Sequence, residues 1–555
     1  MRTGGQLIVD QLVVHGVDVA FGVPGESYLA VLDALHDAPI RFVSCRHEVG
    51  AANMADAVGK LTGRPGICMV TRGPGATHAA GGIHTAYQDS TPLILLIGQV
   101  GREMMEREAF QEIDYRQMFG PMAKWVAQID SADRIPELLS RAFHVATSGR
   151  PGPVVLALPE DMLVDESNAE DVAPYTITRV HPAETDVETA RTLLAGAERP
   201  LVVVGGAPWS AEANEALTTW CVASGIPVAS GWRCQDYVDN TADVYVGHLG
   251  LGPDARLAQR VRETDVLLVI GDRLSEITTS GYTLLEVPTP AQSLIHVTAD
   301  PNELGRVYAP TLGIVASPDS FARSLAATSA LDPDRRQAEI GRGRADYLAN
   351  LVHTPVPGDL DLGEVMATLR ERLPADAILT NGAGNFTVWA HRFYEFRQYR
   401  TQLAPTSGAM GYGVPAAVAA KILHSRRTVV CIAGDGDFLM TGQELATAVQ
   451  ENAAVVILVV NNGMYGTIRM HQERHYPGRV SGTDLVNPDF AALARAFGAH
   501  GAVVERTADF AAALEEALAC GRPAVIELRV DQEALTPRQS LSEIREAAQA
   551  RLSPS

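Results

Sequence analysis

The stretch TVVCIAGDGDF (428–438) joins a short β-branched run to a glycine-rich turn that carries two aspartates. The segment TGQELATAVQEN (441–452) follows, with Thr441 and Glu444 at the spacing of a capping box and apolar residues recurring on one helical face. A second apolar run, AAVVILVV (453–460), comes next. A strand, a turn, a helix and a strand in this order predict a parallel α/β sheet.

The same alternation of apolar run, glycine turn and helical segment continues along the whole chain. We therefore predict an α/β protein with three doubly wound parallel-sheet domains. Two charged, irregular stretches, 164–186 and 331–359, are expected to be linkers. The predicted parts of the chain are domains at 1–165, 185–330 and 358–530 and a polar C-terminal tail at 531–555.

Composition excludes several classes of protein. The chain has 555 residues, 46% of them hydrophobic, and a formal net charge of −21, so a nucleic-acid partner is not expected. The longest apolar runs are far shorter than the roughly 20 residues that span a bilayer, and the N-terminal stretch MRTGGQLIVDQLVVHG (1–16) predicts an amphipathic helix. We expect no membrane partner and a cytoplasmic location. The 6 cysteines are scattered and are expected to be reduced core thiols.

The aspartates of the opening stretch can bind a metal ion as well as form a turn. Asn461 and Asn462 directly follow the second apolar run. Two strands that bracket one helix can be neighbours in a parallel sheet, so we expect Asp435 and Asn462 at the same sheet edge. A carboxylate and an amide oxygen are ligands that Mg²⁺ accepts, and Gly434 and Gly436 let the backbone approach a phosphate. The alternative is an ordinary glycine turn that ends a buried strand.

The composite of GDGDF (434–438) and NNG (461–463) resembles the diphosphate and magnesium signature of thiamine diphosphate enzymes. The whole chain is similar to the acetolactate synthase-like branch of these enzymes, which contains 2-oxo acid decarboxylases and carboligases. By this resemblance the magnesium ligands are the side chains of Asp435 and Asn462 and the carbonyl of Met464. The resemblance also implies a pyrimidine-binding, a central and a diphosphate-binding domain, in that order.

Glu48, in RHEVGAANMADAVG (46–59), resembles the glutamate that activates the cofactor in this family. A glutamate at a helix N-terminus that interacts with the helix dipole is the alternative. Met410, in TSGAMGYGVPAA (406–417), stands where the family has a bulky apolar residue that props the cofactor into its bent form. The full set of expected cofactor contacts is Pro24, Gly25, Glu48, Thr71, Met410, Gly434, Asp435, Gly436, Asp437, Asn462, Met464, Tyr465 and Gly466.

The substrate side departs from the synthase pattern. Glu26, in FGVPGESY (21–28), stands where the synthases have a second glycine; it is either a general acid/base or a charge at a helix N-terminus. His78 replaces the usual asparagine of the Gly-Pro-Gly loop, and His84 is also unusual. Whether either histidine acts on substrate stays open.

The segment 109–114 and His471 are two further places where the synthase pattern bears on the substrate. AFQEID (109–114) matches it and places Phe110 and Gln111 near the mouth of the active site, with Lys124 a weaker correspondence. His471 stands by position where the synthases have a tryptophan that helps to select the acceptor. It either moves protons or belongs to a basic, solvated loop together with His475.

The central domain can hold an accessory nucleotide. Its glycine turns resemble the flavin-binding positions of the synthases, with Asp300 retained but Thr298 in place of an acid. FAD is therefore possible, beside an ADP-like ligand or an empty site.

The resemblance implies decarboxylation of a 2-oxo acid and transfer of the resulting acyl carbanion to an acceptor, with thiamine diphosphate and Mg²⁺ as cofactors. Catalytic candidates are Glu48, Glu26, Gln111 and His471. It also implies a homodimer or homotetramer with active sites between subunits. A simple 2-oxo acid decarboxylase or another thiamine diphosphate C–C lyase is the alternative.

Two rivals come from other classes. A flavin-dependent oxidoreductase needs a complete Gly-x-Gly-x-x-Gly turn, which GGAPWSAEA (205–213) lacks. A non-catalytic cofactor-binding subunit is disfavoured by the joint presence of Glu48, Asp435 and Asn462.

Overall fold

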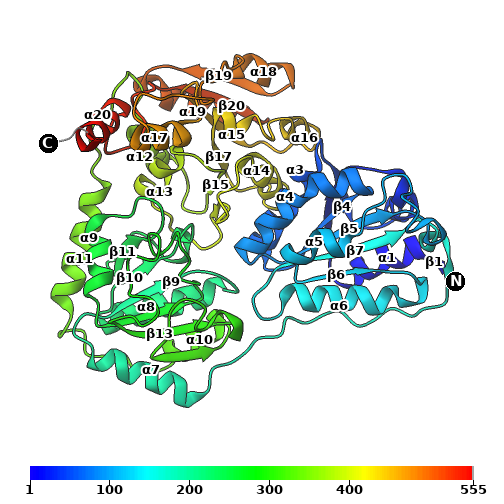
Figure 1. The fold of residues 1–555 in the computed structure, drawn as a ribbon, viewed down its shortest axis with the longest axis horizontal. Helices are drawn as coiled ribbons and strands as arrows, with labels where there is room; N and C mark the ends of the chain where they lie inside the picture. Colours follow the sequence, from blue (N-terminus) through cyan, green and yellow to red (C-terminus); the bar gives the residue numbers. More distant parts are fainter. Residues whose placement is uncertain (553–555) are drawn as a thin grey trace. The chain divides into compact units, whose positions relative to one another are not determined.

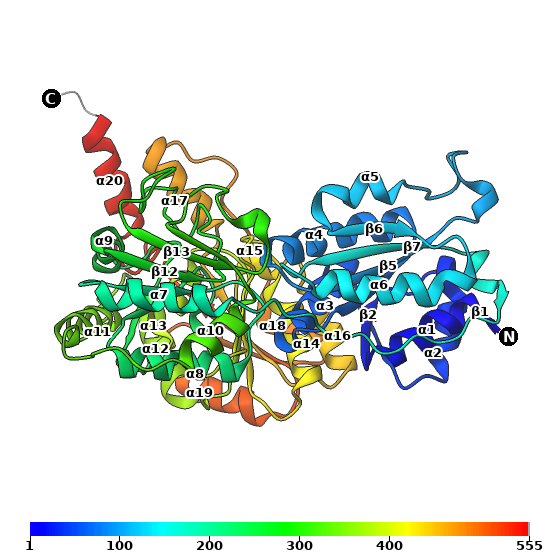
Figure 2. The same cartoon turned by 90° about the horizontal axis from the view of Figure 1, so that it is seen from below.

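The computed structural model describes residues 1–552 and contains three sheets of six parallel strands, each flanked by helices (Figure 1, Figure 2). The predicted α/β class with three doubly wound parallel sheets is confirmed. The chain divides into two compact units. The first unit consists of Met1–Thr178, Pro405–Ser425 and Thr441–Ala453, and the second of Arg179–Ala404, Arg426–Met440 and the chain from Ala454 onwards.

The first unit is built on the sheet β3-β2-β4-β5-β7-β6. Helices α1, α2 and α6 cover the face that carries Ile67, Ile94 and Val154, and α3 and α4 pack on the other. Its strands are β1 (Arg2–Thr3), β2 (Val19–Gly22), β3 (Arg41–Ser44), β4 (Gly66–Val70), β5 (Leu93–Gln99), β6 (Trp125–Gln128), β7 (Pro153–Pro159) and β8 (Glu166–Ser167). Its α-helices are α1 (Gly4–Val14), α2 (Leu29–His36), α3 (Glu48–Thr62), α4 (Gly73–Asp89), α5 (Tyr115–Phe119), α6 (Ile135–Thr147), α14 (Gly413–Leu423) and α16 (Glu444–Gln450). Short 3₁₀ helices are η1 (Glu26–Tyr28), η2 (Arg102–Met104), η3 (Gly120–Met122), η4 (Ala132–Arg134) and η5 (Met162–Val164).

The second unit contains the central sheet, in the order β11-β10-β9-β12-β13-β14. The strand sequence runs outward in both directions from the pair β9 and β12, which is the arrangement of doubly wound nucleotide-binding sheets. Its strands are β9 (Leu201–Val204), β10 (Val228–Ser230), β11 (Tyr245–His248), β12 (Val266–Ile270), β13 (Ser293–Thr298) and β14 (Leu312–Val315). The accompanying helices are α7 (Glu184–Gly196), α8 (Ala211–Ser224), η6 (Gln235–Tyr237), α9 (Ala255–Glu263), η7 (Pro301–Glu303), α10 (Pro318–Ala326) and α11 (Gln337–Leu351).

The second unit also contains the sheet β16-β15-β17-β18-β20-β19, whose order repeats that of the first unit's sheet. In both sheets the first and third strands are neighbours, and the order reverses there. Its strands are β15 (Ile378–Asn381), β16 (Gln402–Leu403), β17 (Val429–Gly434), β18 (Val456–Asn461), β19 (His500–Val504) and β20 (Ala524–Arg529). The helices are α12 (Leu362–Arg372), α13 (Phe386–Phe393), α15 (Asp435–Phe438), α17 (Gly466–His475), α18 (Phe490–Ala496), α19 (Thr507–Ala519) and α20 (Leu541–Leu552).

Three expectations about local structure need correction. Residues 331–359 are not a plain linker, because α11 occupies their centre, with Ile340 and Tyr347 buried on the same helical face. Thr441 and Glu444 form no capping box: α16 begins only at Glu444, and the Thr441 hydroxyl donates to the carbonyl of Gly411. The polar tail contains a helix, α20, whose Arg545 donates to the buried carboxylate of Glu473 over 2.9 Å.

Other expectations agree with the structure. The N-terminal stretch forms the helix α1, which starts at a capping box between Thr3 and Gln6. Within residues 1–552, none of the helices has the length and apolar character needed to cross a bilayer. All 6 cysteines are free thiols, and only Cys520 is partly exposed.

Candidate active site

In the first unit, predicted site residues lie at the carboxyl ends of β2, β3 and β4. The strand order reverses between β2 and β4, and ligands of doubly wound sheets bind at such a reversal. Pro24 and Gly25 follow β2, Glu48 follows β3, and Thr71 follows β4. The Thr71 hydroxyl lies 3.0 Å from that of Ser27, which joins two of these loops.

Glu48 is the first residue of α3, and its side chain is 11% exposed. Its Oε2 lies within hydrogen-bond distance of Nδ1 of His78 on α4, at 2.9 Å, and the tautomer or cation that carries a proton on Nδ1 donates it to the carboxylate. The ring of His47 lies 4.6 Å from that of His78, centroid to centroid. Burial, and secondarily the neighbouring His78, lower the pKa of His47, while the Glu48 carboxylate opposes the shift.

Glu26 contacts an arginine that the sequence analysis did not single out. Arg72, which is 7% exposed, donates Nη1 to Oε1 of Glu26 over 3.3 Å and Nη2 to Glu160. The Glu26 side chain itself is 65% exposed. The arrangement holds a solvent-facing carboxylate against a buried cation at the edge of the sheet.

The loop that carries Gln111 reaches the start of α4. Gln111 has a φ of +67°, and its carbonyl accepts from the amide of Gly73 over 2.9 Å. Its Oε1 is buried and has no hydrogen-bond partner within residues 1–552, whereas Phe110 is 74% exposed. Lys124 does not face this loop, because its ammonium donates to the carbonyls of Val145 and Ser148. His84 lies exposed on α4 and is not part of the Glu48 pair.

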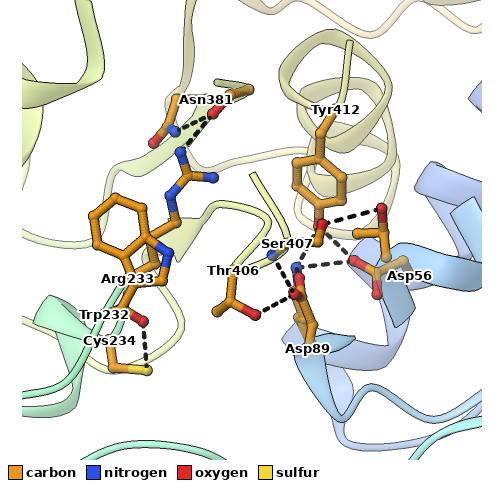
Figure 3. A network of polar contacts seen from close by, with 12 residues as sticks. Asp56, Asp89, Trp232, Arg233, Cys234, Asn381, Thr406, Ser407 and Tyr412 are labelled. Carbon is orange, nitrogen blue, oxygen red and sulfur yellow. Dashed lines mark hydrogen bonds and ion pairs between the residues drawn. The ribbon is translucent and has the colours of Figure 1, made fainter. Parts of the chain in front are cut away.

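The segment that carries Met410 is fixed by a buried polar network (Figure 3). Asp89 of α4 accepts from Thr406 and from the amide of Ser407, and Asp56 of α3 accepts from the Tyr412 hydroxyl over 2.7 Å. Lys60, with a side chain 17% exposed, forms ion pairs with both aspartates. Sequence reasoning missed these residues, since a carboxylate on a helix gives no sign of its partner some 320 residues away.

In the second unit, β17 and β18 are paired neighbours, as the sequence predicted. Their carboxyl ends therefore bring the turns that hold Asp435 and Asn462 together. Oδ2 of Asp435 accepts from the amide of Gly463 over 2.9 Å, and Oδ1 accepts from the amide of Gly436. Asn462 Oδ1 accepts from the amide of Met464.

Asn487 completes this group and was missed by the sequence analysis. Its Nδ2 donates to Asp435 Oδ2 over 2.7 Å and to Asn461 Oδ1 over 2.9 Å. The sequence offered no signal for it, because Asn487 lies in an irregular stretch without a motif.

The chemistry of this group fits Mg²⁺. Burial raises the pKa of Asp435, against hydrogen bonds that favour its charged form. In the described part of the chain no cationic side chain pairs with it. A divalent cation would offset the cost of the buried charge, and a carboxylate such as that of Asp435 and an amide oxygen such as that of Asn462 are donors that Mg²⁺ accepts.

The remaining predicted residues of this edge pack around the same turn. A Cβ on Gly436 would lie 2.5 Å from the ring of Tyr465, so only glycine fits there. Asp437 Oδ1 accepts from the amide of Ala383, which follows β15. Gly466 begins α17, and His471 lies exposed on that helix with its ring stacked on His475 at 6.4 Å.

The expected flavin positions of the central sheet are explained by packing. Gly206 and Gly271 have positive φ, and a Cβ on Gly206 would lie 2.0 Å from the carbonyl oxygen of Gly271. The Asp300 carboxylate accepts from the amide of Asn302 in its own turn. These residues therefore do not by themselves indicate a flavin.

Nearby in the chain, Arg233 donates to the carbonyl of Gly382 over 2.9 Å (Figure 3).

Comparison with known proteins matches three stretches of the chain to one enzyme family. The descriptions "Thiamine pyrophosphate enzyme, N-terminal TPP binding domain", "central domain" and "C-terminal TPP binding domain" match residues 2–118, 187–325 and 382–528. The chain is 32% identical over 532 residues to the acetolactate synthase isozyme 2 large subunit of Escherichia coli, which covers 95% of this chain and 96% of that protein.

Two further relatives have similar extents. The acetolactate synthase large subunit of Corynebacterium glutamicum is 33% identical, over 96% of this chain and 87% of that protein. The probable acetolactate synthase large subunit of Methanocaldococcus jannaschii is 32% identical, over 95% and 92%. With three matching domains and relatives along nearly its full length, the chain belongs to the acetolactate synthase-like family of thiamine diphosphate-dependent enzymes, which act on 2-oxo acids.

Proposed function

We propose that this enzyme catalyses the Mg²⁺-dependent decarboxylation of a 2-oxo acid and transfers the resulting acyl group to an acceptor. The observation that carries the proposal is the group at the ends of β17 and β18, where the buried Asp435 accepts from the turn of Asn462. The relatives named acetolactate synthase support a carboligase.

Bound thiamine diphosphate would supply a nucleophilic carbon and an electron sink for the electron pair that stays behind when carbon dioxide leaves. Asp435, Asn462 and the Met464 carbonyl would hold Mg²⁺ and through it the diphosphate. The Glu48 carboxyl, buried at the end of β3, would hydrogen-bond the aminopyrimidine. Met410, on a segment fixed by Asp56 and Asp89, would support the bent cofactor.

The remaining cofactor candidates would contribute mainly backbone. Pro24, Gly25 and Thr71 lie in the loops after β2 and β4 and would line the pyrimidine side. The diphosphate side would be lined by Gly434, Gly436, Asp437, Tyr465 and Gly466, which pack around one turn. Glycine at such positions permits close approach of a phosphate.

Simple decarboxylation is the second candidate, and one observation favours it. Glu26 places a solvent-facing carboxylate, held by Arg72, at the sheet edge that carries Glu48. A carboxyl there can deliver a proton to the reacting carbon, which would release an aldehyde instead of a ligated product. Gln111 and His471 are the other residues proposed to act on substrate.

Cofactor binding is the first test. Apo-enzyme is titrated with thiamine diphosphate in the presence and absence of Mg²⁺, and binding is followed by quenching of tryptophan fluorescence. We expect saturable binding that requires Mg²⁺ and is lost in Asp435→Ala, while the surface variant Asp359→Ala binds as wild type. Absence of binding by wild-type enzyme would overturn the proposal and favour the flavin-dependent alternative, which a visible absorption spectrum tests.

The reaction itself is tested with a panel of 2-oxo acids, each with and without a second oxo acid or aldehyde, and products are identified by mass spectrometry. Ligated products support the carboligase, and aldehydes alone support the decarboxylase. Glu48→Gln should retain cofactor binding and lose turnover by at least about 100-fold, as expected for loss of an essential proton-transfer group. Wild-type turnover in this variant would remove Glu48 from the mechanism.

We also propose a cytoplasmic homodimer or homotetramer with active sites between subunits. The loop before α5 supports it, since Met104 and Phe110 expose 54% and 74% of their surface. Light scattering coupled to gel filtration measures the assembly. A monomer that is active at all dilutions would contradict it.

A further inference from the structure

The carboxylate of Glu48 is contacted by a titratable side chain from another helix. His78 Nδ1 lies 2.9 Å from Glu48 Oε2, across the interface of α3 and α4. An imidazole can take up and release a proton near neutral pH. The contact therefore gives the Glu48 carboxyl a neighbour that is capable of proton exchange.

The two partners differ in exposure. The Glu48 side chain is 11% exposed, whereas that of His78 is 53% exposed. The contact thus joins a buried carboxyl group to a ring that reaches solvent. It uses Oε2, and the other oxygen, Oε1, lies beside Gly75, 3.5 Å from where a Cβ of that residue would be.

The ring of His47 also contacts that of His78. Nδ1 of His47 accepts from the amide of Val49 over 3.1 Å, so this imidazole is held in one orientation at the N-terminus of α3. Its centroid lies 4.6 Å from that of His78, with 33° between the planes. Rotation of His78 away from Glu48 would break this ring contact as well as the hydrogen bond.

The other titratable groups that interact with this pair are poor proton donors. Burial, reinforced by Cys68 and then by the Glu48 charge, raises the pKa of Tyr28 of η1. Burial, reinforced by the Glu48 charge, raises the pKa of Cys68 of β4. Burial lowers the pKa of His47, which disfavours the charged form of that ring. Of the groups that interact with Glu48, His78 alone within residues 1–552 combines direct contact with exposure to solvent.

We infer that His78 is the proton-exchange partner of Glu48 and links this buried carboxyl to solvent. The inference rests on the proposed role of Glu48 in cofactor activation. In the step, the Nδ1–H bond of the imidazolium breaks as an Oε2–H bond forms on Glu48, and the ring recovers its proton from a solvent acid. His78 is a positioning residue, since it acts through Glu48.

The first experiment uses apo-enzyme and does not depend on the reaction. Histidine is labelled with ¹⁵N, and the Nδ1 resonance of His78 is assigned with His78→Asn. In Glu48→Gln this resonance should shift, because a carboxylate acceptor is replaced by an amide, while the His84 resonance stays in place. An unchanged His78 resonance would overturn the inference whatever the cofactor does.

The second experiment measures exchange of the C2 hydrogen of bound thiamine diphosphate for deuterium, by rapid quench and NMR. His78→Asn should slow exchange about 10- to 100-fold and remove the wild-type pH dependence, with cofactor affinity within about twofold. In His78→Ala, added imidazole should restore part of the rate. His84→Asn, on the same helix, should exchange like wild type.

The outcomes separate the inference from the proposed function. Wild-type exchange in Glu48→Gln would remove Glu48 as activator, and with it the proposed mechanism. Slow exchange in Glu48→Gln together with wild-type exchange in His78→Asn would overturn the role of His78 alone. So would a slow His78→Asn whose pH profile matches wild type and a His78→Ala that imidazole does not rescue, since both would indicate a structural effect.

Discussion

Asn487 donates its amide to Asp435 over 2.7 Å and so fixes the carboxylate proposed to bind Mg²⁺. Residues that orient a metal ligand commonly contribute 10- to 100-fold to metal affinity. We expect Asn487→Ala to weaken Mg²⁺ binding about 10-fold, measured by calorimetry at saturating thiamine diphosphate. Burial already raises the pKa of Asp435, and loss of this hydrogen bond to the charged form raises it further. The pH below which Mg²⁺ binding fails should therefore move upward.

A matched substitution separates this effect from general damage to the loop. Val486 precedes Asn487 and is fully exposed, so Val486→Ala should bind Mg²⁺ as wild type. Equal Mg²⁺ affinities of Asn487→Ala and Val486→Ala would exclude Asn487 from the metal site.

Arg72 contacts two carboxylates, and these offer an internal comparison. Glu26 follows β2 beside the proposed site, and Glu160 follows β7. If Glu26 transfers a proton in the reaction, Glu26→Gln should lower kcat about 100-fold and leave cofactor affinity within about twofold. Glu160→Gln removes the other carboxylate from Arg72 and should lower kcat far less. Equal losses in both variants would mean that the arginine, and not Glu26, matters.

Lys60 neutralises two buried carboxylates, and its removal should loosen α3 and α4. Asp56 and Asp89 have side chains 0% and 1% exposed, and both pair with Lys60. Removal of one member of a buried ion-pair group costs about 3 kcal/mol, because the remaining charges stay buried. In Lys60→Met, amides of α3 should exchange with deuterium about 100-fold faster, as mass spectrometry of peptides measures.

Tyr412→Phe serves as the graded comparison for Lys60. It removes only the hydroxyl that donates to Asp56, a change worth about 1 kcal/mol, or about fivefold in exchange rate. A Lys60→Met variant that exchanges no faster than Tyr412→Phe would show that the ion pairs contribute little.

Helix α20 is tied to α17 by a pair whose strength depends on pH. Hydrogen bonds, chiefly from Arg545, lower the pKa of Glu473 from 4.5 to about 2. A lowered carboxyl pKa contributes stability that is fully present above the unfolded value and is lost as pH falls toward the folded value. From pH 8 to pH 5, the free energy of unfolding of wild type should therefore exceed that of Glu473→Gln by about 1–2 kcal/mol, and wild type should melt at a higher temperature.

Scanning calorimetry across pH checks this expectation. The difference in melting temperature should shrink between about pH 4.5 and about pH 2, where the wild-type carboxylate takes up its proton. A difference that stays constant down to pH 3, or grows there, would contradict the assignment of the pH dependence to Glu473.

The fold class was predictable because it rests on periodicity. Apolar runs of strand length alternate with helical segments, and a parallel sheet is the arrangement that buries both faces of such runs. Helix α11 was missed within a charged stretch, since Ile340, Gly343 and Tyr347 form an apolar face too sparse to stand out among arginines and acids. The capping box was wrong for a different reason: Glu444 accepts from the amides of Arg46 and His47, so a tertiary contact replaces the local one.

The family and the two turns that follow β17 and β18 could be predicted from the sequence, because the motifs are local and the ends of neighbouring parallel strands meet at one sheet edge. Which side chains contact the site residues depends on tertiary packing. Asn487 on Asp435, Arg72 on Glu26 and His78 on Glu48 are contacts between residues 30 to 52 positions apart, from separate elements. A periodic pattern records which face of an element is buried. It does not record which polar group meets another across the interface, because that depends on how the packed elements align.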